Sequence, residues 1–149
     1  MMCKKASRLR IKWPHDHPLR ANFDRSNSTA LHLPSIGLVV SGDCVCNNAH
    51  LYLAECDERA RSEWLQALDK IESLEPQAVV AGHGVLDPDS SPRHIEETRR
   101  YLNDFNACVA TTSTTLELYE RMLSLHPDRV NPGSLWAARK NCETSLKHD

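Results

Sequence analysis

Two residues able to bind a metal ion stand in similar local sequences. Asp43 follows the run Gly-Leu-Val-Val-Ser-Gly, and His83 follows the run Ala-Val-Val-Ala-Gly. Each apolar run is expected to form a strand, and open α/β sheets place their ligands beyond the carboxyl ends of strands. The glycine before each polar residue lets the backbone turn closely and expose the side chain. Carboxylate and imidazole are both zinc ligands, so Asp43 and His83 are the candidate metal-binding residues.

A second set of possible zinc ligands begins directly after Asp43. Its members fall within thirteen residues and are Cys44, Cys46, His50 and Cys56. The set lacks the Cys-x-x-Cys spacing that is typical of structural zinc sites. Small thiols that follow a strand are commonly buried as packing residues. Packing and a structural zinc site are therefore the two interpretations of this segment, and the spacing favours packing.

The elements that must position these residues follow from hydrophobic periodicity and capping signals. Short β-branched and apolar runs predict strands, and the turn between the first two predicts a hairpin. The expected strands are 30–33, 38–40 and 78–81. Apolar residues at helical spacing, with Asp57, Pro92, Thr114 and Asn131 as start signals, predict the helices. The expected helices are 57–74, 92–111, 114–126 and 132–138. This alternation indicates an α/β layered fold with helices packed on a sheet.

The two strand-end motifs, in this order and separated by one helix, resemble the second half of the metallo-β-lactamase superfamily. The resemblance rests on Leu-His-Leu-Pro-Ser-Ile-Gly-Leu-Val-Val-Ser-Gly-Asp (31–43) and Ala-Val-Val-Ala-Gly-His-Gly (78–84). It runs from about residue 30 to 138, and the tail is similar to uncharacterised microbial and fungal members. It implies an incomplete αββα sandwich: one small sheet packed by helices, with a helical C-terminal extension. It also implies that Asp43 bridges two metal ions and that His83 is a terminal ligand, with zinc as the cofactor, up to two ions in the intact fold.

The superfamily's main ligand motif, His-x-His-x-Asp-His, is absent from this sequence. His15-Asp16-His17 lacks the final Asp-His pair, and no strand is expected before it. Asn22 stands near the position at which the family has a further histidine, and asparagine is a much poorer zinc ligand. Catalytic zinc usually has three protein ligands. Asp43 and His83 alone are therefore expected to bind metal weakly.

These observations divide the chain into an irregular basic and polar tail (1–29), the C-terminal half of a metallo-β-lactamase-like domain (30–125) and a helical extension (126–149). By resemblance the chain is a metal-dependent hydrolase of small ester- or lactone-like molecules, present as a truncated half that is inactive alone. The alternative is a non-catalytic remnant that acts as an interaction module. Half of a sandwich exposes a sheet face, so self-association or binding of the missing N-terminal half is expected. His50 and Tyr52 either line the substrate pocket or serve packing.

Composition excludes several other classes of protein. A net charge of −2 and an aromatic content of 5% argue against nucleic-acid binding. No apolar run approaches the ~20 residues of a membrane span, and the basic segment 1–12 lacks the apolar stretch of a secretory signal. That segment is either a solvated tail or a mitochondrial transit peptide. The six cysteines are irregularly spaced, which is typical of reduced thiols in a cytoplasmic protein.

Overall fold

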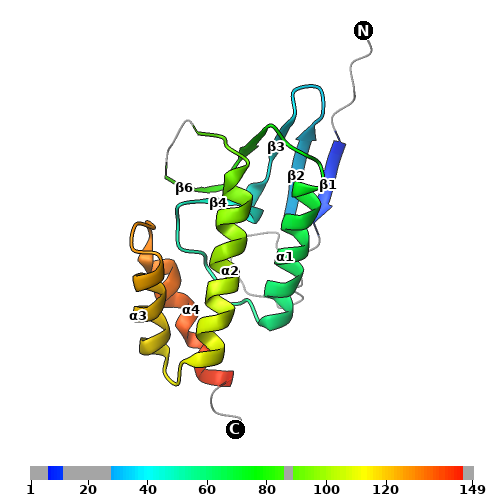
Figure 1. Cartoon of the computed structure of the whole chain (residues 1–149). Helices are drawn as coiled ribbons and strands as arrows, with labels where there is room; N and C mark the ends of the chain where they lie inside the picture. The colour runs from blue at the N-terminus through cyan, green and yellow to red at the C-terminus, as the bar shows by residue number, and fades with distance from the viewer. Residues whose placement is uncertain (1–6, 12–27, 86–88, 146–149) are drawn as a thin grey trace.

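The computed structural model describes residues 7–11, 28–85 and 89–145. Strands and helices are interleaved along this part of the chain (Figure 1). The strands are β1 (Ser7–Ile11), β2 (Ser28–Leu33), β3 (Leu38–Val40), β4 (Cys46–Asn47), β5 (Ala78–Val80) and β6 (His83–Gly84). The helices are the short 3-10 turn η1 (Gly42–Cys44) and the α-helices α1 (Glu58–Glu72), α2 (Arg93–Thr111), α3 (Thr115–Leu125) and α4 (Pro132–Ser145). The mixed α/β fold expected from the sequence is confirmed.

The strands form two small sheets. The larger sheet has the order β1-β2-β3-β5, with β1, β2 and β3 antiparallel and β5 parallel to β3. The expected hairpin is present, since Leu33 pairs with Leu38 across the turn that holds Gly37 at a φ of 62°. The smaller sheet joins β4 to β6 in parallel register, with Cys46 opposite His83. Strand β1 differs from the irregular tail that the sequence predicts for residues 1–29.

Capping side chains begin two of the helices at the positions that the sequence indicates. Asp57 accepts a hydrogen bond from the backbone N–H of Ala60, at the start of α1. The Thr114 hydroxyl accepts from the N–H of Glu117, at the start of α3. The Glu117 carboxylate in turn accepts from the N–H of Ser113, one residue earlier than in the usual reciprocal box. Each cap satisfies an N–H group that the helix itself leaves without a partner.

Helices α1 and α2 lie side by side on one face of the larger sheet (Figure 1). The buried face of the sheet carries Ala30, Val39 and Val79, all in one apolar cluster with residues of the helices. From α1 this cluster includes Trp64, Leu68 and Ile71; from α2 it includes Tyr101, Leu102 and Phe105. Helix α3 packs against both α4 and α2. Leu118 and Met122 of α3, with Leu135 and Ala138 of α4, belong to the same buried cluster.

Across β2, β3 and β5, the opposite face of the same sheet is apolar and partly exposed. Strand register places its residues in two rows: Leu31, Val40 and Val80 in one, and Leu33, Leu38 and Ala78 in the other. Leu31 and Val80 are each 39% exposed, whereas the neighbouring Val39 and Val79 on the helix side are fully buried. We call these six residues the open sheet face. It is the surface that the sequence analysis expects in an incomplete sandwich.

No α-helix among the described ranges combines the length and the apolar character that crossing a bilayer requires. The histidines of the failed ligand motif, His15 and His17, and Asn22 lie outside the described residues. Of the candidate metal ligands, the structure therefore describes Asp43, His83 and the residues of the cysteine segment.

Trp64 links the core to the strand end that carries Asp43, because its indole N–H donates to the Cys44 carbonyl at 2.8 Å. We expect Trp64→Phe to lower the free energy of unfolding by about 2–3 kcal/mol. Three effects contribute to this loss: the hydrogen bond is removed, the buried Cys44 carbonyl loses its donor, and the smaller ring leaves a cavity. Urea denaturation measures it. Trp136 is 42% exposed, so Trp136→Phe should change stability by less than about 0.5 kcal/mol. Equal losses in both variants would contradict this role of Trp64.

Candidate functional site

The structure brings Asp43 and His83 into contact. Asp43 lies in η1, directly after β3, and His83 lies in β6, directly after β5. The Nε2 atom of His83 is 2.9 Å from Oδ1 of Asp43, and each side chain is 68% exposed. The two candidate ligands, forty residues apart in sequence, therefore present a nitrogen and an oxygen side by side to solvent.

Parallel pairing of β3 with β5 is the cause of this contact. The carboxyl ends of parallel strands lie at the same edge of a sheet, so the residues that follow them meet there. Ser41, at the end of β3, donates its N–H to the Val80 carbonyl at 3.0 Å, and its hydroxyl donates to the same oxygen at 2.9 Å. Ser41 is only 1% exposed. This buried serine therefore fastens the two strand ends just before the chain reaches the ligand pair.

The segment 81–84 approaches the segment 42–47 so closely that only glycine fits at two positions. The N–H of Gly82 lies 3.0 Å from the Gly42 carbonyl and 3.2 Å from the Val45 carbonyl. A Cβ atom at residue 82 would stand 2.4 Å from the Gly42 oxygen, and one at residue 84 would stand 1.8 Å from the Asn47 oxygen. Gly84 also has a φ of 140°, which side chains disfavour. The glycines that flank His83 thus set how near it comes to Asp43.

Side chains from α2 and β4 fix the backbone of β4, the strand that pairs with the one carrying His83. Thr98, fully buried, accepts from the Cys46 N–H at 3.1 Å and directs its hydroxyl toward the His94 carbonyl at 2.7 Å. The Asn47 amide donates to the Val85 carbonyl at 3.2 Å, and the Val85 N–H donates to the Asn47 carbonyl at 3.0 Å. These bonds fix β4, and β4 in turn pairs with the strand that carries His83.

The structure favours packing as the role of the cysteine segment. Burial, together with the nearby Cys46 and Asp43, raises the pKa of the Cys44 thiol to about 12. Burial also raises the pKa of Cys46 to about 12, against the opposing effect of Arg129. Thiolate is the metal-binding form, so burial of these two thiols disfavours metal binding. Within the described ranges no group of three or more histidine, cysteine or acidic side chains is placed to hold a metal ion. The structure therefore favours packing over a structural zinc site for Cys44, Cys46, His50 and Cys56.

His50 belongs to a buried polar cluster and not to a pocket wall. It is 3% exposed, and its Nδ1 lies 3.0 Å from the Tyr101 hydroxyl. Tyr52, by contrast, is 49% exposed. Of the two residues considered for a pocket, the structure assigns His50 to packing and leaves Tyr52 at the surface.

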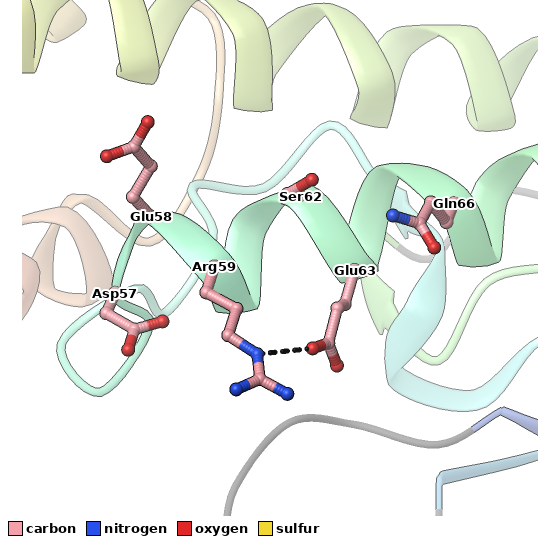
Figure 2. Close-up of a pocket in the computed structure, with 6 residues that line it drawn as sticks. All are labelled: Asp57, Glu58, Arg59, Ser62, Glu63 and Gln66. Atoms are coloured by element: carbon pink, nitrogen blue, oxygen red, sulfur yellow. Dashed lines mark hydrogen bonds and ion pairs between the residues drawn. The ribbon is translucent and has the colours of Figure 1, made fainter.

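A surface hollow of about 550 Å³ lies elsewhere, along the first turns of α1 (Figure 2). Its lining residues all come from the start of this one helix: Asp57, Glu58, Arg59, Ser62, Glu63 and Gln66. Figure 2 shows Arg59 turned toward Glu63, with which it forms an ion pair at 2.9 Å. Asp57 is engaged as the helix cap. The hollow contains neither Asp43 nor His83, so it is a separate feature of the surface.

The ligand pair fits a zinc ion only in part. Bonds of about 2.0–2.1 Å in tetrahedral geometry separate two zinc ligands by roughly 3.3 Å, and the 2.9 Å between the His83 and Asp43 atoms is close to this spacing. The types of the two donors also suit zinc. However, catalytic zinc usually takes three protein ligands, and the described residues supply two. The pair is thus one edge of a coordination site and not a complete one.

The fold matches part of the crystal structure of a metallo-β-lactamase family protein from Thermus thermophilus. The TM-score is 0.50 and the sequence identity is 19%. The match covers 81% of this chain and 41% of that chain, so the present chain spans less than half the length of the protein it matches. No protein-family model matches the sequence, and no curated protein sequence does. At this identity the likeness establishes the fold alone, and it confirms the expected partial metallo-β-lactamase fold.

Sequence reasoning identified the two candidate ligands but missed the residues that hold them. Ser41, Asn47 and Thr98 make their bonds to backbone atoms far along the chain. No periodicity reports such a contact. A local signal did exist in Ser-Gly-Asp and Gly-His-Gly, where small residues surround each ligand. Those small residues indicate that other backbone comes close, although they do not identify which.

Gly82→Ala should disturb the backbone that holds Asp43 and His83 together. The new methyl group would meet the Gly42 carbonyl, so the two segments must move apart. We expect a loss of about 1–3 kcal/mol of stability, the usual cost of overpacking, measured by thermal or urea denaturation. The matched control is Gly133→Ala in the first turn of α4, where the nearest atom to a new Cβ is 3.7 Å away. That variant should keep or slightly raise stability. A neutral Gly82→Ala would show that the close approach is absent in solution.

Proposed function

We propose that this chain supplies two ligands, Asp43 and His83, to the metal centre of a metal-dependent hydrolase of the metallo-β-lactamase kind. The observation that carries the proposal is the contact between these side chains at the ends of β3 and β5, within a fold that matches a metallo-β-lactamase family protein. Zinc is the proposed metal, up to two ions when the ligand set is complete. Because the described residues hold only two donors, hydrolysis by this chain alone is not proposed.

The proposed substrate is a small ester- or lactone-like molecule. A carboxylate and an imidazole that share one metal site suit metal-assisted hydrolysis of such bonds. The fold does not select among the substrates of this chemistry. The proposed compartment is the cytoplasm, which the inert buried thiols of Cys44 and Cys46 support.

A second candidate function is that of a non-catalytic interaction module. The open sheet face favours it, because its six apolar residues stand in register and two of them, Leu31 and Val80, are each 39% exposed. Sheets bury such a face against another layer about 10 Å away. The proposed occupant is a second copy of this chain, joined face to face. If the chain does not self-associate, the favoured occupant is the complementary half of a sandwich on another polypeptide.

Zinc binding tests the first proposal. The purified chain should bind zinc weakly and reversibly at the pair, and Asp43→Ala/His83→Ala should abolish that binding. Titration calorimetry with zinc, backed by elemental analysis after dialysis, measures both. The matched control is Cys44→Ser/Cys46→Ser, which removes two other potential ligands and should leave zinc binding unchanged.

Two results would count against the ligand role. Zinc binding that survives in the Asp43/His83 double variant would place the metal elsewhere. A wild-type chain that binds no zinc even at millimolar concentration would leave the interaction module as the better function. Circular dichroism of each variant confirms that the fold persists.

Self-association tests the second proposal. Val80→Lys places a charge on the open sheet face at its β5 edge, so it should shift a dimer toward monomer in sedimentation velocity. It should also reduce the fluorescence of a hydrophobic dye. Leu116→Lys is the control, because Leu116 is 53% exposed on α3, away from this sheet. A dye-silent monomer at every concentration of the wild-type chain would contradict an available apolar face.

A further inference from the structure

A buried cluster of polar aromatic and cationic side chains joins the C-terminal helices to the rest of the molecule. Tyr101 of α2 is its centre and is fully buried. His50 donates or accepts a hydrogen bond at the tyrosine hydroxyl, at 3.0 Å, and meets the ring edge-on. The ring of His126, the residue that ends α3, lies 4.8 Å from the tyrosine ring. The guanidinium of Arg129 lies over the same ring, 4.7 Å from its centre.

The segment that contains His126 and Arg129 is the attachment point of the helical pair α3 and α4. Backbone bonds join Val130 to both Asn48 and His50, each at 2.9 Å. Arg129 donates to the Ala49 carbonyl and to the Glu97 carbonyl, each at 2.8 Å. These bonds connect the loop between α3 and α4 to the segment after β4 and to α2. Because this loop directly follows α3, loss of its bonds should also weaken the packing of α3 on α2.

Arg129, which is half-buried, places a positive charge beside the two histidines. Burial, together with the nearby Arg129 and His126, lowers the pKa of His50 to about 4. Burial and Arg129 also lower the pKa of His126, against the opposing effect of Asp104. Asp104 lies 3.0 Å from Nε2 of His126 without the alignment of a hydrogen bond, and it is shared with Arg100 at 3.8 Å. Arg129 makes its own hydrogen bonds to carbonyls. The titratable and charged groups that face the two histidines are Arg100, Tyr101, Asp104 and Arg129. Cys46 and Glu97 in turn lie near Arg129.

We propose that this cluster is an acid-sensitive latch, in which protonation of His50 and His126 releases the loop 126–131 and undocks α3 and α4 from α2. In the docked state both imidazoles are neutral, and Arg129 is the one charge that the tyrosine ring and two carbonyls accommodate. Protonation adds up to two further cations within one buried cluster, for which Asp104 is a single, shared counterion. The released state exposes both histidines to water, which solvates their charges.

The direction of the pH effect follows from proton linkage. Both histidines have a lower pKa when docked than the ordinary value of about 6.5, so the released state binds more protons. Docking is therefore fully stabilised above pH 6.5 and weakens as the pH falls from there toward 4. For each additional proton bound, the equilibrium constant for release rises by up to about tenfold per pH unit. The core of α1 and the larger sheet contains neither histidine and should not follow this dependence.

Hydrogen–deuterium exchange tests the latch, with rates corrected for the intrinsic effect of pH. Between pH 7 and 4.5, peptides that cover α3 and residues 126–131 should lose protection by tenfold or more, while peptides from α1 keep theirs. NMR titration of the ring signals should show His50 and His126 protonating at lower pH than an ordinary histidine, whose pKa is about 6.5. In His50→Gln/His126→Gln the protection of α3 should no longer depend on pH. His32→Gln, in the β2 strand, should behave as the wild type does.

Each alternative result has a definite meaning. If α3 and α1 lose protection together, the chain unfolds globally in acid and the latch is wrong. If the double variant keeps the wild-type pH dependence, other groups carry it and the two histidines do not. Should the double variant fail to fold, His50→Gln alone is decisive. This variant removes one titrating group, so the number of protons taken up on release, measured as the slope of log protection against pH, should fall by about one. An unchanged slope there would also overturn the proposal.

Discussion

Parallel pairing between β3 and β5 is the constraint on which the rest of the structure depends. Antiparallel hairpins need only a turn, whereas a parallel pair requires a crossover, which here is the loop 41–57 followed by α1. That crossover places α1 on the sheet and carries β4 past the end of β5. The same pairing brings Ser41 to Val80 and Gly42 to Gly82. The candidate site is thus a direct consequence of the strand order.

The contact between Asp43 and His83 is a product of the backbone and contributes little to holding it in place. Both side chains are 68% exposed, and exposed ion pairs typically contribute no more than about 1 kcal/mol before screening by salt. The backbone around them, by contrast, is tightly defined: Gly42 and Gly84 have positive φ angles, and a Cβ at residue 82 or 84 would overlap a carbonyl. The backbone thus holds the two donor atoms in place for a metal ion, and their mutual attraction is not needed to position them.

Particular residues show how far the sequence alone can go. Helix α1 could be predicted because Asp57 caps it and its buried residues recur at helical spacing. The hairpin and β5 could be predicted from their β-branched runs. Strand β1 could not, since Ser-Arg-Leu-Arg-Ile alternates polar and apolar residues too briefly to stand out in a basic segment. Its place depends on pairing with β2, which is a tertiary contact. The strands β4 and β6 have two residues each and carry no periodic signal.

Burial explains why the residues of the cysteine segment resemble zinc ligands in the sequence but have other roles in the structure. Cys44, Cys46 and His50 are all types that bind zinc, yet each has a different partner in the structure. The Cys44 carbonyl receives the Trp64 indole, the Cys46 backbone meets Thr98, and the His50 ring meets Tyr101. Those partners lie on α1 and α2, far along the chain. Burial among them raises the pKa of each thiol and lowers that of the imidazole. The segment thus connects the ligand pair to the helices, and the same burial that makes it an effective support disfavours the thiolates that zinc binding requires.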